Sequence, residues 1–160
     1  MATEIKIFKE AIHTHLNVND KAELISILAK PLLEKKYVTA EFAEKVLERE
    51  EKFPTGLPLK KIGVAIPHTD PKYVLKNAIS IGVLKKPLPF KVMASPEQSV
   101  NVGIIFLLAL NDSEKHLEIL QKLISLIQNE KALFQILNGS KDEIFHFIDR
   151  QLKGGESSYD

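Results

Sequence analysis

The chain has no cysteine among its 160 residues. Disulfide bridges, thiolate nucleophiles and cysteine-based metal sites are therefore excluded. This absence is typical of proteins that work in a reducing compartment, and we expect a cytoplasmic location. Long apolar stretches are also missing, because the longest, over residues 102–110, has nine residues. That is too short for a helix that spans a bilayer, and the N-terminal segment lacks the apolar core of a signal peptide.

The chain also lacks an excess of charge of either sign. Lysine and arginine number 22 against 21 aspartate and glutamate, which gives a formal net charge of +1. This balance offers no electrostatic reason to bind nucleic acid or an anionic membrane, and we expect neither. Arginine itself is scarce, with only Arg49 and Arg150 among the basic residues. The two positions stand out because a guanidinium offers a planar fork of donors that lysine cannot copy.

The length and the absence of internal repeats favour a single domain over residues 1–152, followed by a flexible tail over residues 153–160. Apolar residues make up 44% of the chain and charged residues 27%, ordinary values for a globular protein. Apolar patterns predict strands over residues 5–18, 63–66, 78–84 and 100–110. Helical patterns predict helices after Asp20 and over residues 40–52, 111–129, 131–137 and 140–151. Strands mixed with helices indicate an α/β fold with a central sheet.

Individual residues mark where these elements start and stop. Capping boxes are predicted for the pairs Asp20 and Glu23, Asn111 and Glu114, and Ser140 and Glu143. Thr39 is predicted to cap the helix over residues 40–52. Pro31 is expected to kink or break the first helix. Loops or a sheet edge are expected around Pro87, Pro89 and Pro96.

His68 is the first candidate functional residue. It follows the apolar strand of residues 63–66, and loops at strand ends commonly carry functional side chains on a rigid scaffold. Asp70 followed by Pro71 has the form of an N-cap with proline at the first helical position. Such a helix start would offer His68 backbone N–H groups that favour anions, so His68 could hold a phosphoryl group. The alternative is a turn histidine that is bonded only to the backbone.

Arg49 is the second candidate. It falls on one helical stripe with Phe42, Val46 and Phe53, so we expect it on or beside an inward-facing surface. An inward arginine needs an anionic partner, because an unpaired buried charge is costly. The alternative is a cation that is favourable simply because it lies near a helix C-terminus.

His116 is the third candidate. It lies in the first turn of the helix that follows the strand over residues 100–110. It leans inward on a stripe with Leu120, Leu123 and Ile127. The end of that strand and the start of that helix could meet the His68 loop. The alternative is a satisfied interior histidine.

The other histidines suggest less. His13 and His15 alternate on a predicted strand and could face one way, which would suit zinc, but no third ligand is evident nearby. We therefore expect no metal site. His146 lies between two phenylalanines and is interpreted as a surface or interface residue. The sequence has no glycine-rich nucleotide loop, no G-x-S-x-G elbow and no H-E-x-x-H helix.

Two motifs carry a family resemblance. Residues 49–56, Arg-Glu-Glu-Lys-Phe-Pro-Thr-Gly, and residues 63–68, Gly-Val-Ala-Ile-Pro-His, resemble the fructose/mannitol-type enzyme IIA family of sugar phosphotransferase systems. The longer segment EREEKFPTGLPLKKIGVAIPHTD looks closest to the galactitol-specific branch. The resemblance covers about residues 5–152. It implies a mixed central β-sheet flanked by helices on both faces.

The resemblance also implies a role for each candidate. His68 matches the histidine that is phosphorylated in the family, and Arg49 matches the arginine that steadies the phosphoryl group. His116 matches a second active-site histidine of mannitol and fructose members, which not all galactitol members have. No cofactor and no metal are needed for the transfer, and an exposed apolar patch is expected where partners dock.

The implied activity is that of a phosphotransferase with a phosphohistidine intermediate. The donor would be the phosphorylated carrier protein HPr, and the acceptor a cysteine of a IIB component on another polypeptide. The pathway would serve uptake and phosphorylation of a sugar or sugar alcohol, with galactitol suggested by the branch. The alternative is a regulatory enzyme IIA of the nitrogen-related type, which acts by phosphorylation-dependent binding to other proteins.

Overall fold

The computed structural model describes residues 5–153, apart from the side chains of Ser113, Lys115, His116 and Lys153. The strands are β1 (Lys6–Leu16), β2 (Gly56–Leu57), β3 (Gly63–Ala65), β4 (Ala78–Val92) and β5 (Ser95–Ala109). The helices are α1 (Lys21–Glu34), α2 (Phe42–Lys52), α3 (Ser113–Ile127), α4 (Glu130–Asn138) and α5 (Lys141–Lys153), with one short 3-10 helix, η1 (Pro71–Tyr73). The C-terminal tail expected to be flexible lies, beyond residue 153, outside the described residues.

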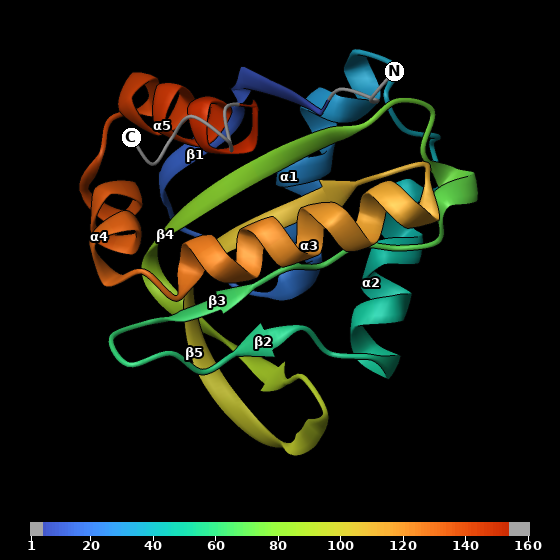
Figure 1. Ribbon diagram of the computed structural model, residues 1–160. Helices are drawn as coiled ribbons and strands as arrows, with labels where there is room; N and C mark the ends of the chain where they lie inside the picture. The colour runs from blue at the N-terminus through green and yellow to red at the C-terminus, as the bar shows by residue number, and fades with distance from the viewer. Residues whose placement is uncertain (1–4, 154–160) are drawn as a thin grey trace.

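The five strands form one mixed sheet. β4 runs parallel to β1 and pairs with β5 in a long antiparallel hairpin (Figure 1). β3 runs parallel to β5 and antiparallel to β2. Just after β3, the Leu108 N–H donates to the Pro67 carbonyl oxygen at 3.0 Å. The loop that follows β3 is therefore anchored to the central hairpin.

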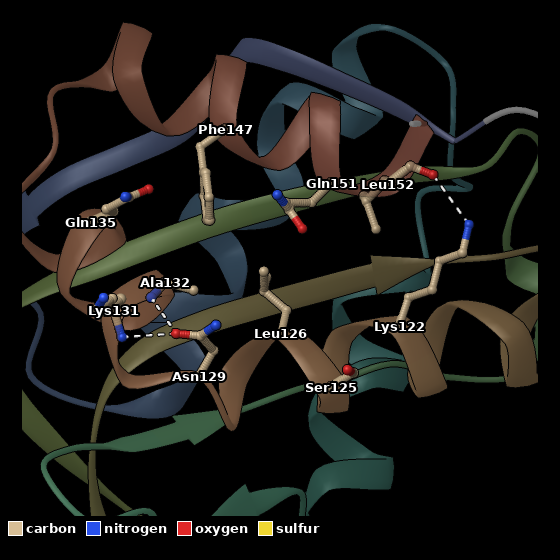
Figure 2. Close-up of a pocket in the computed structure, with 10 residues that line it drawn as sticks. All are labelled: Lys122, Ser125, Leu126, Asn129, Lys131, Ala132, Gln135, Phe147, Gln151 and Leu152. Atoms are coloured by element: carbon tan, nitrogen blue, oxygen red, sulfur yellow. Dashed lines mark hydrogen bonds between the residues drawn. The ribbon is translucent and has the colours of Figure 1, made fainter. Parts of the chain in front are cut away.

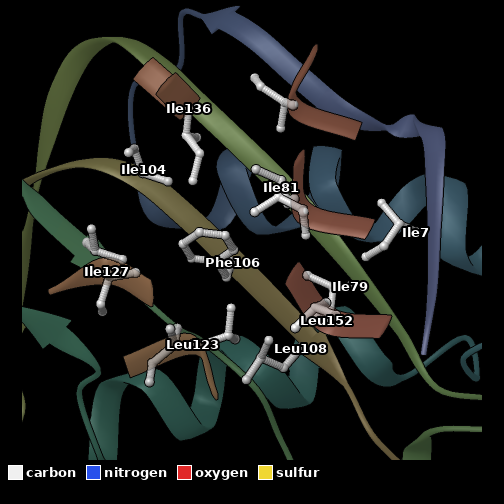
Figure 3. Close-up of a cluster of buried hydrophobic side chains, with 14 of the residues drawn as sticks. Ile7, Ile79, Ile81, Ile104, Phe106, Leu108, Leu123, Ile127, Ile136 and Leu152 are labelled. Carbon is white, nitrogen blue, oxygen red and sulfur yellow. The ribbon is translucent and has the colours of Figure 1, made fainter. Parts of the chain in front are cut away.

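Apolar side chains cover both faces of the sheet. On one face Phe106 packs among residues of α3, α4 and α5, including Leu123 and Ile136 (Figure 3). On the other face Ile105 and Leu107 pack against α1 and α2. Adjacent residues of β5 thus point to opposite faces, as a strand requires, and each buried side chain of this size contributes about 1.5–3 kcal/mol. The layers confirm the predicted fold class, a mixed sheet flanked by helices on both faces.

One of the predicted capping boxes is complete, and a second is present in part. At α1 the Glu23 N–H donates to the Asp20 carboxylate at 2.8 Å, but the Glu23 carboxylate accepts the N–H of Asn19 and not that of Asp20. At α5 the Glu143 N–H donates to the Ser140 hydroxyl at 3.1 Å, and the Ser140 N–H donates back to Glu143 at 2.8 Å. These bonds satisfy backbone donors that a helix start would otherwise leave without partners.

Two of the local predictions about helices were wrong, and a third was wrong in part. Of the kink or break expected at Pro31, the break is absent, because α1 continues through the buried Pro31 to Glu34. Thr39 does not cap α2, which begins at Phe42, and its N–H instead donates to the Tyr73 carbonyl. Asn111 does not cap α3. The Asp112 carboxylate accepts the Glu114 N–H at 2.8 Å. The Asn111 side-chain amide instead donates to the Leu75 carbonyl.

The prolines after residue 84 lie in strands and not in loops. β4 extends to Val92 and includes Pro87 and Pro89, and β5 begins before Pro96. All three prolines are exposed. The pairing with β5 is also irregular between Val83 and Leu88, and irregular or edge positions tolerate proline within a sheet. The hairpin is consequently longer than the apolar pattern predicts.

Candidate functional site

A hollow of about 330 Å³ brings together segments that are far apart in the sequence. It is lined by Arg49, His68, Thr69, Asp70, Pro71, Leu117 and Leu120. These residues come from the last turn of α2, the loop after β3 and the first half of α3. Arg49 and His68 thus line one hollow.

The His68 ring is held by its own backbone. Its Nδ1 lies 2.8 Å from the Ile66 carbonyl oxygen, and the side chain is half-buried. A carbonyl oxygen only accepts, so Nδ1 carries the proton in this bond. In the neutral ring the lone pair then belongs to Nε2. His68 therefore makes the backbone hydrogen bond expected of a turn histidine, and its ring also lines the hollow.

Arg49 is exposed, so it lies beside the buried face of α2 and not on it. Phe42 and Val46 are fully buried, but Phe53 is 59% exposed, so the stripe leaves the core at its C-terminal end. The Arg49 guanidinium lies over the Phe53 ring, with Cζ 5.1 Å from its centroid. An exposed guanidinium needs no buried counter-ion, and its donors can serve an anion that enters the hollow.

The buried face of α2 ends instead in Glu50, which sequence reasoning missed. Glu50 is 2% exposed and accepts two hydrogen bonds from Thr55, from the N–H at 2.9 Å and from the hydroxyl at 2.8 Å. Burial raises the pKa of this carboxyl, while the two bonds from Thr55 and the charge of Lys21 act in the opposite direction. A signal existed, since Phe42, Val46 and Glu50 are spaced by four residues along the helix.

The helix start after His68 is too short to form an anion site. Asp70 caps the turn and Pro71 is its first residue, as predicted, but η1 ends at Tyr73. The Lys72 N–H donates to the Asp70 carboxylate at 3.0 Å, and the Tyr73 N–H donates to the Asp70 carbonyl at 3.2 Å. The N–H groups expected to face an anion therefore have partners within the turn itself.

His116 lies in the first turn of α3, but its side chain lies outside the described part of the structure. Its neighbour Leu117 and the more distant Leu120 line the hollow. Leu117 is 60% exposed, which agrees with the apolar patch expected around the site. The role of His116 stays a prediction.

The two histidines of β1 do not form a matched pair. His13 is half-buried, whereas His15 is exposed and has a φ of 55°. The register with β4 shifts between His13 and Leu16, so strict alternation fails there. Burial lowers the pKa of His13 and the charge of Lys141 lowers it further, while the nearby backbone of Ile81 acts in the opposite direction. Among the side chains that the structure describes, which do not include that of His116, no three histidines, aspartates or glutamates gather as metal ligands would.

A larger hollow, of about 530 Å³, lies between α3, α4 and α5 (Figure 2). Its polar groups serve the helices around it. Lys122 donates to the Leu152 carbonyl at 3.3 Å, and the Asn129 side chain accepts the N–H groups of Lys131 and Ala132. The residues that line it include no histidine and no carboxylate. It offers no nucleophile comparable to His68.

The protein thus has an α/β fold, in which a histidine that follows a short strand and an arginine from the last turn of α2 line one hollow. The family model described as "Phosphoenolpyruvate-dependent sugar phosphotransferase system, EIIA 2" matches residues 6–151. The chain belongs to this family, whose members are phosphotransferase components. Among residues 5–153, no helix combines the length and the apolar character that a membrane crossing requires.

Two curated relatives extend the match. The transcriptional regulator ManR of Bacillus subtilis is 32% identical over 93 residues, which are 58% of this chain but only 13% of the regulator. The galactitol-specific EIIA component of Escherichia coli K12 is 23% identical over 117 residues, or 73% of this chain and 77% of that protein. The chain thus corresponds to a small part of one relative and to most of the other.

Solved structures share the fold. The Escherichia coli complex of enzyme IIAMtl with phosphorylated enzyme IIBMtl matches with a TM-score of 0.74 at 20% identity, over 94% of this chain and 99% of that one. The nitrogen regulatory protein IIA-Ntr of Neisseria meningitidis matches with a TM-score of 0.71 at 21% identity, over 92% and 96%. At these identities the likeness concerns the fold.

Proposed function

We propose that this protein is a phosphocarrier that accepts a phosphoryl group from phospho-HPr on His68 and passes it to a separate IIB component. The observation that carries the proposal is the anchored His68 ring, whose Nδ1 donates to the Ile66 carbonyl at 2.8 Å in a hollow that Arg49 also lines. Membership of the EIIA 2 family supports it.

The hydrogen bond at Nδ1 supports Nε2 as the attacking atom. The Nε2 lone pair forms the new bond to phosphorus while the bond from phosphorus to the donor protein breaks and its electron pair leaves with the donor. In the second step the acceptor on IIB attacks phosphorus, and the bond to Nε2 breaks. Such a transfer depends mainly on positioning and on stabilising the charge of the equatorial oxygens. Arg49 is suited to the second task because its fork of donors matches a phosphoryl group.

The rim of the hollow supports docking of partner proteins. Leu117 and Phe53 are 60% and 59% exposed, and exposed apolar side chains around a site commonly mark a protein interface. A chain of the complex of enzyme IIAMtl with phosphorylated enzyme IIBMtl shares the fold of this chain, and that complex supports a IIB component as one partner. HPr is the second partner of the proposal.

The proposal extends to the pathway that the phosphocarrier serves, which is either sugar uptake or regulation. The galactitol-specific relative supports uptake of galactitol, a sugar alcohol. The matches to ManR and to IIA-Ntr support the alternative, a regulatory enzyme IIA that acts by phosphorylation-dependent protein binding. Label that passes from the phosphorylated protein to a galactitol IIB component favours transport. Label that remains on this protein in the presence of that component favours regulation.

Phosphorylation in a mixture of phosphoenolpyruvate, enzyme I and HPr tests the central claim. We expect acid-labile label on the wild-type protein, because phosphohistidine hydrolyses in acid, and none on His68→Ala. Label that persists on a correctly folded His68→Ala protein would refute the assignment of His68.

A further inference from the structure

Glu50 is a buried carboxyl group that the proposed transfer does not use. It is 2% exposed, although its neighbours Arg49 and Glu51 on α2 are exposed. It is not among the residues that line the hollow. A buried carboxylate is costly unless hydrogen bonds compensate it, so its position calls for an explanation beyond solubility.

The bonds of Glu50 lead to the loop that carries His68. The carboxylate accepts the Thr55 N–H at 2.9 Å and the Thr55 hydroxyl at 2.8 Å. The same hydroxyl accepts the Ile66 N–H at 3.1 Å. The carbonyl of Ile66 in turn accepts the His68 Nδ1–H at 2.8 Å. A continuous series of hydrogen bonds therefore joins α2 to the His68 ring.

The series constrains both ends of one residue. Ile66 has its N–H held by Thr55 and its carbonyl held by His68, so a shift at Thr55 rotates the group that orients the ring. It also reaches Arg49, because Glu50 is the next residue of the same helical turn. The buried Glu50 carboxylate is thus linked to both side chains of the proposed site, to His68 through hydrogen bonds and to Arg49 through the backbone of α2.

We propose that Glu50 and Thr55 are positioning residues that hold the His68 ring in its Nδ1–H form and fix Arg49 beside it. This inference rests on the proposed function, but the state of the unphosphorylated ring can be measured without any transfer. Neither residue touches the phosphoryl group; both act through Ile66 and the end of α2.

Thr55→Val and Thr55→Ser form the decisive pair. Valine keeps the shape but removes the hydroxyl, so Ile66 and Glu50 each lose a partner, whereas serine keeps all three bonds. We expect acceptance of phosphate from phospho-HPr to slow by up to about a hundredfold in Thr55→Val. Serine should restore the rate to within about twofold of wild type. Nitrogen-15 spectra of the imidazole should show the Nδ1–H form of His68 in the wild type and in Thr55→Ser, and a shift toward the Nε2–H form in Thr55→Val.

Two further variants separate positioning from stability. Ser80→Ala removes another buried hydrogen bond, from the Ser80 hydroxyl to the Ala11 carbonyl at 3.2 Å, which is not part of this series. We expect it to lower the melting temperature without changing the rate or the His68 spectrum. Glu50→Gln keeps the volume of the side chain, but its N–H₂ only donates, so the Thr55 hydroxyl must turn from donor to acceptor at this contact and reorient beneath the Ile66 N–H. It should shift the His68 spectrum in the same direction as Thr55→Val, and it tests the series if Thr55→Val does not fold.

Several outcomes would overturn the inference. A folded Thr55→Val protein with a wild-type His68 spectrum does so, as does a Thr55→Ser protein that behaves like Thr55→Val. A loss of melting temperature without any change in the spectrum would reduce both residues to structural supports. If the wild type accepts no phosphate, the proposed function fails, yet the spectra of the same variants still decide whether Glu50 and Thr55 position the ring.

Discussion

Two histidines of this protein, His68 and His13, are held in opposite ways. His68 follows β3, and its Nδ1 donates to a carbonyl oxygen 2.8 Å away, in a hollow open to the surface. His13 lies within β1, and in the described part of the chain its buried Nδ1 has no hydrogen-bond partner. Burial favours the neutral form of His13 and lowers its pKa. One ring is oriented by a defined bond, while the other is kept neutral mainly by its surroundings.

The difference shows what a histidine needs in order to carry a group. A fixed proton on one nitrogen assigns the lone pair to the other, and a hollow beside the ring gives a partner protein access to it. Arg49 lines the hollow at His68. The positive charge near His13 is that of Lys141, and it lowers the pKa of the His13 ring. The same side chain type thus serves a proposed transfer site at one position and the packing of a strand at the other.

Alanine at each histidine gives the largest expected contrast. His68→Ala should take no label from phospho-HPr, because the nucleophile is gone, whereas His13→Ala should take label to the wild-type level. The measurement is incorporation of phosphate at a temperature well below the melting temperature of each variant. A folded His13→Ala protein that fails to incorporate label would contradict the comparison.

The two arginines provide the next test. Arg49→Lys should still be labelled, but roughly 10- to 100-fold more slowly, because an ammonium lacks the fork that holds two phosphoryl oxygens. Arg150→Lys, an exposed position on α5, is the matched control and should behave like the wild type. Single-turnover transfer from phospho-HPr measures both rates. Equal rates for Arg49→Lys and the wild type would remove Arg49 from the proposed site.

The exposed rim of the His68 hollow predicts a smaller effect. Leu117→Ser should raise the KM for a partner protein roughly three- to tenfold with little change in kcat, because an apolar contact is lost only on docking. Leu33→Ser is the control, since Leu33 is 44% exposed on α1 and does not line the hollow. A change in kcat alone for Leu117→Ser would argue for a role in the chemistry and against one in docking.

Much of this molecule could be predicted from short stretches of sequence. The N-cap roles of Asp20 and Ser140 were predicted correctly, because the bonds that define them join residues three positions apart. The position of His68 beyond a short buried strand was also correct, since a proline and a turn signal mark the end of that strand. Both results depend on contacts within a few residues of the chain.

What could not be predicted depends on contacts between distant elements. Arg49 was expected on or beside an inward-facing surface, but it is exposed, and Glu50 takes the buried position after Val46. The buried place of Glu50 depends on Thr55 and on Ile66, which approaches only because β3 pairs with β2. The shift in register after His13 likewise arises from pairing with β4. Periodicity alone contains none of these contacts.

The smallest of the four expected effects is the loss, at acid pH, of the stability that His13 contributes. The lowered pKa of His13 means that the unfolded chain, with its ordinary value of 6.5, binds a proton before the native state does. The stability that His13 contributes is therefore complete above 6.5 and is lost as the pH falls through its lowered folded value. The buried Glu50 carboxyl has a raised pKa and acts in the opposite sense, because its native state binds the proton first.

The difference between wild type and His13→Gln isolates the contribution of His13, since Glu50 is present in both. Glutamine keeps a polar side chain but does not titrate. The free energy of unfolding of His13→Gln should therefore fall less steeply than that of the wild type between about pH 7 and pH 5. Denaturant unfolding at several pH values in that interval measures both slopes. Parallel slopes would mean that His13 titrates alike in the folded and unfolded states, and the contrast with the His68 ring would then rest on geometry alone.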